Sequence, residues 1–119
     1  MSELDEVFAA VAAYFAVMAE PTRVKIIHAV CREERSVNQI AEELGATQTN
    51  VSRHLGHMYR SGVLARRKAG NQVFYRISDA TMIEICRAVC THIAARIDER
   101  RPLRKGLLKL IPDLRKAAA

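Results

Sequence analysis

The chain has 119 residues, enough for one domain with a modest core, and half of them are apolar, which excludes a disordered protein. The longest apolar run, residues 7–19, is too short to cross a bilayer, and the amino-terminal MSELDE lacks the basic start of a signal peptide, so we expect a cytoplasmic protein. The net charge of +6 is uneven: residues 1–46 carry 4 basic and 8 acidic groups, residues 47–76 carry 6 and none, and residues 77–119 carry 9 and 5, a polarity that favours a protein that binds nucleic acid.

Two helices are predicted at the start of the chain. Over residues 3–19, apolar side chains recur at helical spacing and form one stripe, while acidic residues occupy the first turn, where the helix dipole favours them. Pro21 ends this helix or opens the next, which covers residues 22–32 and is apolar on two faces, so we expect it to be central. The stripe of the first helix consists of Leu4, Val7, Phe8, Val11, Phe15 and Met18.

A helix-turn-helix pattern follows. Ser36 and Gln39 form a capping-box pattern at the start of a third helix, and Gly45 marks its left-handed stop. Thr47 then caps a fourth helix that extends to about residue 61 and is anchored by Val51, Leu55 and Met58. Amides and arginine can read base edges, and short hydroxyl side chains allow a close approach to DNA. The side chains left to face solvent or a ligand are Gln48, Thr49, Asn50, Ser52, Arg53 and His57.

A basic β-hairpin is predicted directly after the fourth helix. Residues 63–68 and 72–77 alternate apolar and polar side chains and are rich in Val, Phe and Tyr, and Ala69-Gly70-Asn71 forms the turn. No Asp or Glu occurs between residues 47 and 76. Such a wing can contact phosphates or enter the minor groove. Its cations are Arg66, Arg67, Lys68 and Arg76.

A long last helix is predicted over residues 80–100, capped by Ser78 or Asp79. One small domain cannot cover both its apolar stripe and that of the first helix, so we expect a homodimer that pairs through these helices. We expect residues 1–101 to form the DNA-binding and dimerisation domain. Residues 102–119 then form a basic, Leu-rich tail, in which Gly106 and Pro112 limit any helix, and which packs on the dimer or frays without binding a membrane. The stripe of the last helix is Met82, Ile85, Cys86, Val89, Ile93 and Ile97.

Four motifs occur together and in order. They are Ala-x-x-x-Arg at the entry to the second helix, Val-Ser-x-His-Leu in the fourth, Gly-Val-Leu before the hairpin and Val-Phe-Tyr-Arg-Ile on its return strand. With these motifs the chain resembles the ArsR/SmtB family of bacterial winged-helix repressors over about residues 19–91. The resemblance implies a mainly α winged helix-turn-helix fold of order α-α-α-α-β-β-α. It also implies a homodimer on an imperfectly palindromic operator, released when an effector binds.

The same resemblance implies which side chains contact DNA. In that scheme the fourth helix is the recognition helix and enters the major groove, while the hairpin is the wing. The contacts are Gln48, Thr49, Ser52, Arg53 and His57 on the helix, and Arg66, Arg67 and Lys68 on the wing.

Two standard metal sites of the family have no counterpart in this sequence. The metalloid site is a Cys-x-Cys in the third helix, where this chain reads Arg-Ser-Val-Asn-Gln-Ile at residues 35–40. The zinc site of the last helix uses an Asp-x-His pair and a His-x-x-His pair. Here Asp79-Ala80-Thr81 has no His, and His92 stands alone.

The chain has three cysteines, Cys31, Cys86 and Cys90, an odd number that does not suggest a disulfide scaffold. A branch of the family senses reactive sulfur or oxidants through one Cys on the second helix and one on the last. This chain resembles that layout, although Cys31 lies about one helical turn later, and Cys90 about one turn earlier, than the corresponding cysteines of that branch. Alternatively, the three thiolates form a site for arsenite or a soft metal ion, or all three are inert core residues. His28 lies beside the same face and is interpreted as packing.

The sequence therefore predicts a DNA-binding transcriptional repressor released by a thiol-directed signal at Cys31 with Cys90 or Cys86. The alternatives are an arsenite or heavy-metal responsive repressor that uses the three thiolates, and a DNA-binding protein without an effector. No cofactor is required under the first interpretation. An enzyme is not expected, because the chain has no phosphate-binding loop, no nucleophile elbow and no paired acid and base at a suitable spacing.

Overall fold

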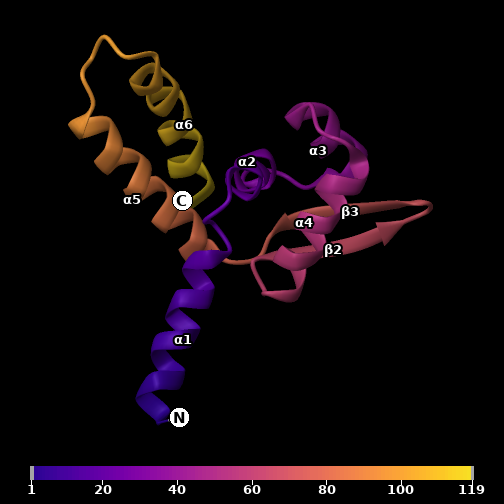
Figure 1. Ribbon diagram of the computed structural model, residues 1–119. Coiled ribbons are helices and arrows are strands. Elements are labelled where there is room, and N and C mark those ends of the chain that lie inside the picture. The colour runs from indigo at the N-terminus through magenta and orange to yellow at the C-terminus, as the bar shows by residue number, and fades with distance from the viewer. Residues whose placement is uncertain (1, 119) are drawn as a thin grey trace.

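Six helices and three short strands make up residues 2–118, the part of the chain that the computed structural model describes (Figure 1). The element order confirms the predicted mainly α winged helix-turn-helix, with one additional strand and one additional helix. The elements are α1 Glu3–Ala16, α2 Pro21–Val30, β1 Arg35–Ser36, α3 Val37–Leu44, α4 Gln48–Arg60, β2 Leu64–Ala69, β3 Gln72–Ile77, α5 Ala80–Arg96 and α6 Pro102–Ala118.

Capping side chains set the starts of the central helices as the sequence predicts. Ser36 accepts a hydrogen bond from the Gln39 backbone at 3.1 Å, and the Gln39 side chain accepts one from the Ser36 backbone at 2.9 Å. Gly45 ends α3 with a φ of 64°, a left-handed conformation that glycine adopts without strain. Thr47 caps α4, and Asp79, the second of the two predicted candidates, caps α5.

Three helices are shorter than predicted. α1 ends at Ala16 rather than at residue 19, because Glu20, directly before Pro21, is extended with φ −134° and ψ 130° and caps α2. α2 ends at Val30 rather than at residue 32. α5 ends at Arg96 rather than at residue 100, because the backbone of Ile97 is extended, with φ −95° and ψ 139°.

The strands form a three-stranded antiparallel sheet of order β1-β3-β2. In the wing, Ala69 pairs with Gln72, so the turn is Gly70-Asn71 alone, one residue shorter than predicted, and Gly70 has a φ of 61°. β1 was not predicted. It has only two residues, which pair with Tyr75 and Phe74 of β3, and so short a strand carries no alternation of its own.

The tail forms one helix, α6, and the expected limit on its length is wrong. Pro112 lies inside the helix. Its ring removes one backbone donor, but Leu107, Ile111 and Leu114 are buried at 9, 9 and 2 % exposure and compensate for the loss. α6 packs along α5 (Figure 1) and also contacts α2. The division of the chain at residue 101 stays a prediction.

Among the helices of the described residues, α1 alone has no buried residue. Figure 1 shows it extending away from the other helices, with α2 in the centre and the α5–α6 pair on the opposite side from the wing. Tyr14 donates a hydrogen bond to Asp79 at 2.7 Å and so ties α1 to the start of α5. No single described helix is long and apolar enough to cross a membrane; α1 and α2 meet that test only as a pair, bent by 73°.

Candidate nucleic-acid interface

The fourth helix presents a polar face that is fixed by a fully buried apolar face. Val51, Leu55 and Met58 are each 0 % exposed and hold α4 against the core. Because residues at a spacing of three or four share a helix face, burial of these three directs the intervening side chains outward. Of the predicted contact residues on this helix, Asn50 is half-buried, and the exposed ones are Gln48, Thr49, Ser52, Arg53 and His57.

Two of these side chains hold one another in place. Arg53 donates a hydrogen bond from its Nη2 to Asn50 Oδ1 at 2.8 Å. The bond restricts the long arginine side chain before any ligand arrives, so less conformational entropy is lost on binding. The remaining donors of the guanidinium stay available for a phosphate or a guanine edge.

The wing is fastened to the recognition helix through Arg66. Its guanidinium lies over the ring of Tyr59 on α4, 3.9 Å from the centroid. A hydrogen bond that Arg66 donates to the Tyr75 side chain, with a smaller contribution from Tyr59, raises the pKa of Arg66 above its ordinary value, so this cation keeps its charge. Arg66 therefore joins β2 to α4, so that the wing and this helix form one continuous surface.

Arg67 has an intramolecular partner that the sequence did not indicate. Its guanidinium donates to both carboxylate oxygens of Glu34, in the α2–β1 connection, and lies 4.7 Å from the centroid of Phe74. The hydrogen bonds from Arg67 hold the pKa of Glu34 below its ordinary value. Glu34 therefore offsets the charge of Arg67. The exposed Lys68 and Arg76 are better placed than Arg67 to contact phosphates.

A polar hollow of about 140 Å³ lies where α3, α4 and the wing meet. Gln48 and Ser52, both predicted contacts, line it from α4. Asn38, Asn71 and Gln72 line it from α3 and the wing tip, and none of the three was predicted. Their amides become recognisable as part of one surface only once the hairpin is folded back towards α3.

We expect Arg66→Ala to weaken binding to every DNA sequence and to make the dependence on salt shallower, by about one in the logarithmic slope. The reason is that Arg66 is a surface cation held at the junction of α4 and the wing. Fluorescence anisotropy over a salt series measures both quantities. A change of sequence preference with an unchanged slope would show instead that Arg66 reads bases.

Comparison with known proteins places this architecture in a family. The family described as "Bacterial regulatory protein, arsR family" matches residues 20–65. The HTH-type transcriptional regulator Rv0081 of Mycobacterium tuberculosis is 32 % identical over 87 residues, which cover 72 % of this chain and 75 % of that protein. The chain belongs to the ArsR family. A probable mercury resistance operon repressor of Streptomyces lividans is 30 % identical over 90 residues, 73 % of this chain and 72 % of that one.

Solved structures agree with this membership. The crystal structure of M. tuberculosis Rv0081 has a TM-score of 0.65 at 30 % identity and covers 81 % of this chain and 93 % of that one. The transcriptional repressor BigR from Xylella fastidiosa has a TM-score of 0.65 at 27 % identity, covering 76 % and 95 %. The ArsR-family protein is thus a DNA-binding transcriptional repressor. This kinship with regulators also confirms the prediction that it is not an enzyme.

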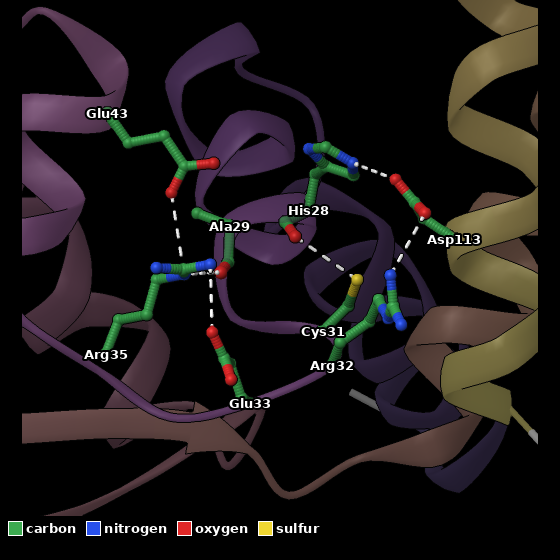
Figure 2. A pocket seen from close by; sticks show the side chains of 8 residues that line it. All are labelled: His28, Ala29, Cys31, Arg32, Glu33, Arg35, Glu43 and Asp113. Atoms are coloured by element: carbon green, nitrogen blue, oxygen red, sulfur yellow. Dashed lines mark hydrogen bonds and ion pairs between the residues drawn. The ribbon is translucent and has the colours of Figure 1, made fainter.

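The three cysteines of this ArsR-family protein lie in two different surroundings. Cys31 lines a hollow of about 370 Å³ at the carboxyl end of α2 (Figure 2). Cys86 and Cys90 line a small apolar gap between α2, α5 and α6, together with Leu110 and Leu114 of α6. The sequence placed all three in one candidate site through the resemblance to the thiol-sensing branch and the three-thiolate alternative, but the folded chain separates their openings.

Burial controls the chemistry of these thiols. Desolvation raises the pKa of all three, that of Cys86 to about 11, with further contributions to Cys86 from the neighbouring Cys90 and Cys31. Cys90 is half-buried, whereas Cys31 and Cys86 are 8 and 4 % exposed. Thiols are therefore the resting form, and Cys90 is the most accessible of the three.

The Cys31 hollow is lined by charges that already have partners. Cys31 Sγ donates to the His28 carbonyl at 3.2 Å, and Asp113 of α6 lies 3.2 Å from His28 Nε2 and 3.5 Å from Arg32 (Figure 2). Arg35 contacts Glu33 and Glu43 across the same hollow. Within residues 2–118, no three His, Cys, Asp or Glu side chains form a group that could hold a metal ion. The three-thiolate site is accordingly not assembled in this structure.

Proposed function

We propose that the protein is a cytoplasmic, homodimeric repressor that binds a palindromic operator through α4 and the wing. The observation that carries this proposal is the exposed face of α4 and β2–β3, which lies in a segment with 6 cations and no carboxylate between residues 47 and 76. Side chains suited to base edges lie on α4, and cations suited to phosphates lie on the wing.

The dimer is supported by apolar surface that one chain leaves uncovered. On α1, five apolar side chains of the predicted stripe are 50 to 62 % exposed, and Val89 and Ile93 of α5 are 45 and 38 % exposed. α6 covers another face of α5, so this face remains open to a second copy. A twofold pair would set two recognition helices about one DNA turn, ~34 Å, apart. The exposed members of the α1 stripe are Leu4, Val7, Phe8, Val11 and Phe15.

The proposed signal is a thiol-directed one, read by Cys31 with Cys90 or Cys86. Two observations support it: Cys86 has both other thiols as neighbours, and Cys90 is accessible enough to react first. With a low-molecular-weight persulfide, RSSH, the Cys90 sulfur forms a bond to the outer sulfur while the donor's S–S bond breaks. RS⁻ leaves and takes up the proton that the thiol lost, so Cys90 becomes a persulfide. A polar persulfide in the apolar gap between α2, α5 and α6 would disturb their packing.

The test is a titration of the protein onto the DNA upstream of its own gene. We expect tight binding to this DNA and at least about 1,000-fold weaker binding to unrelated DNA at physiological salt. Equal affinity for the two would favour a non-specific DNA binder and would contradict the proposed repressor.

The signal is tested by repeating that titration after treatment with a persulfide donor, a thiol oxidant or arsenite. We expect Cys90→Ser to abolish the response while leaving DNA affinity unchanged, because Cys90 is the thiol that becomes the persulfide and it lies outside the interface. Coupling of about 1–3 kcal/mol, or roughly 5- to 150-fold in affinity, makes a useful switch. If wild-type affinity is the same under all three treatments, the protein has no thiol switch. A response to arsenite alone would favour the thiolate alternative.

A further inference from the structure

The recognition helix carries a buried polar side chain, His54, on its inner face. His54 is 9 % exposed and lies between two exposed residues that face the DNA side, Arg53 and His57. A buried imidazole loses its hydration and is stable there only if its nitrogens have partners. One ring nitrogen of His54 faces Arg23 in the first turn of α2, and the other faces Glu20, the N-cap of the same helix.

Arg23 is the first of these partners. Its Nε donates a hydrogen bond to His54 Nδ1 at 3.4 Å, across 31 residues of sequence. Its Nη1 donates to the carbonyl of Ala16, the last residue of α1, at 3.1 Å. One guanidinium therefore connects the carboxyl end of α1 to the middle of the recognition helix.

Glu20 is the second partner and completes the cluster. Its Oε2 accepts from the backbone of Arg23 at 3.1 Å and lies 3.7 Å from His54 Nε2. Desolvation raises the pKa of Glu20, but hydrogen bonds from the Thr22 and Arg23 backbones, with the nearby His54, hold it below its ordinary value. The carboxylate thus stays ionised. As the N-cap of α2 it holds the backbone of Arg23, whose side chain bonds to His54 on α4.

We propose that His54 is a positioning residue for DNA binding, which acts through Arg23 to fix the orientation of α4 relative to the end of α1. This inference rests on the proposed pairing of two copies through α1. In the dimer, the relative placement of two α4 helices depends on how each is joined to the pairing helix. The Ala16–Arg23–His54 connection provides a directional polar joint there, in addition to the non-directional apolar packing of Val51, Leu55 and Met58.

The joint matters because a recognition helix makes its contacts through short hydrogen bonds. These weaken steeply when distance or angle changes, and both half-sites must be met at once. A small tilt of α4 is consequently felt at every base contact, although His54 itself touches no DNA.

The variants separate positioning from mere packing. His54→Leu keeps an apolar side chain at this position but removes both nitrogens. His54→Asn keeps an oxygen acceptor near the position of Nδ1, so it can still accept from Arg23. Arg23→Lys keeps the charge but replaces the planar fork, which directs separate N–H groups at Ala16 and His54, with a single ammonium nitrogen. Ile111→Val on α6 is the control, because it trims a buried side chain far from the joint.

The readouts are operator affinity over a salt series by anisotropy, dimer dissociation by sedimentation, and unfolding in urea. We expect His54→Leu and Arg23→Lys each to lower operator affinity about tenfold, within the usual range of coupling between sites. The double variant should lose no more than either single one. His54→Asn should recover most of the affinity. The salt slope and the dimer dissociation should stay at wild-type values, since no phosphate contact is removed.

Other outcomes would overturn the inference. Additive losses in the double variant, a shallower salt slope, or an equal loss in Ile111→Val would each mean that His54 does not act through Arg23 on orientation. If His54→Leu does not fold, Arg23→Lys and His54→Asn carry the test. Wild-type protein that fails to bind operator DNA as a dimer would defeat the proposed function itself, whereas wild-type binding with unaffected variants would defeat only this inference.

Discussion

Replacing Phe8 with Glu should convert the proposed dimer into a monomer that binds operator DNA at least about 100-fold more weakly. Phe8 is 62 % exposed at the centre of the α1 stripe and makes no contribution to the core of its own chain. A buried carboxylate without a partner would oppose pairing. Without pairing, the second half-site no longer adds its contacts at a high effective concentration, which accounts for a factor of about 10² to 10⁴.

Sedimentation equilibrium and operator anisotropy measure the two effects of Phe8→Glu. Ala13→Glu is the matched control, since it adds the same charge to α1 at an exposed position on the opposite face. The control should remain dimeric with wild-type affinity. A Phe8→Glu protein that still sediments as a dimer would show that the copies pair through another surface.

Replacing Leu55 with Ala should lower the free energy of unfolding by about 2–5 kcal/mol. Leu55 is 0 % exposed and packs from α4 into the main hydrophobic core. Its truncation removes apolar contacts and leaves a cavity, and the loss is a large part of the roughly 5–15 kcal/mol that stabilises a small domain. DNA binding should be lost together with folding, because the same helix carries the contact face.

Urea denaturation followed by circular dichroism checks this value. The midpoint should fall while the slope stays unchanged, as expected when stability alone is altered. Ser52→Ala is the control on the same helix: Ser52 is exposed, so unfolding should change by no more than about 0.5 kcal/mol. A Leu55→Ala protein as stable as wild type would mean that the core closes around the missing side chain.

The local features of the fold were the predictable ones. The reciprocal hydrogen bonds of Ser36 and Gln39 and the left-handed Gly45 depend on neighbours within a few residues, so their sequence signals are sufficient. The inward face of α4 likewise follows from spacing alone. Of the ArsR-family motifs identified from the sequence, Val-Ser-x-His-Leu and Gly-Val-Leu lie inside the family match over residues 20–65, whereas the motif of the return strand lies beyond it.

What the sequence missed depends on contacts between distant segments. β1 exists only because Arg35 and Ser36 meet β3, some 40 residues later. α6 extends through Pro112 because α5 and α2 supply an apolar surface for it, which no local rule includes. The ion pair of Glu34 with Arg67 and the separate openings of Cys31 and Cys86 arise in the same way.

Pairing through the exposed stripe of α1, as we propose, would also set how steeply repression depends on the concentration of the protein. If two chains must meet before either binds well, the number of competent pairs rises as the square of the chain concentration while most chains are single. Halving the amount of protein then leaves about a quarter of the pairs. A helix whose apolar stripe stays uncovered within its own chain would thus make promoter occupancy rise more steeply than the concentration of the regulator.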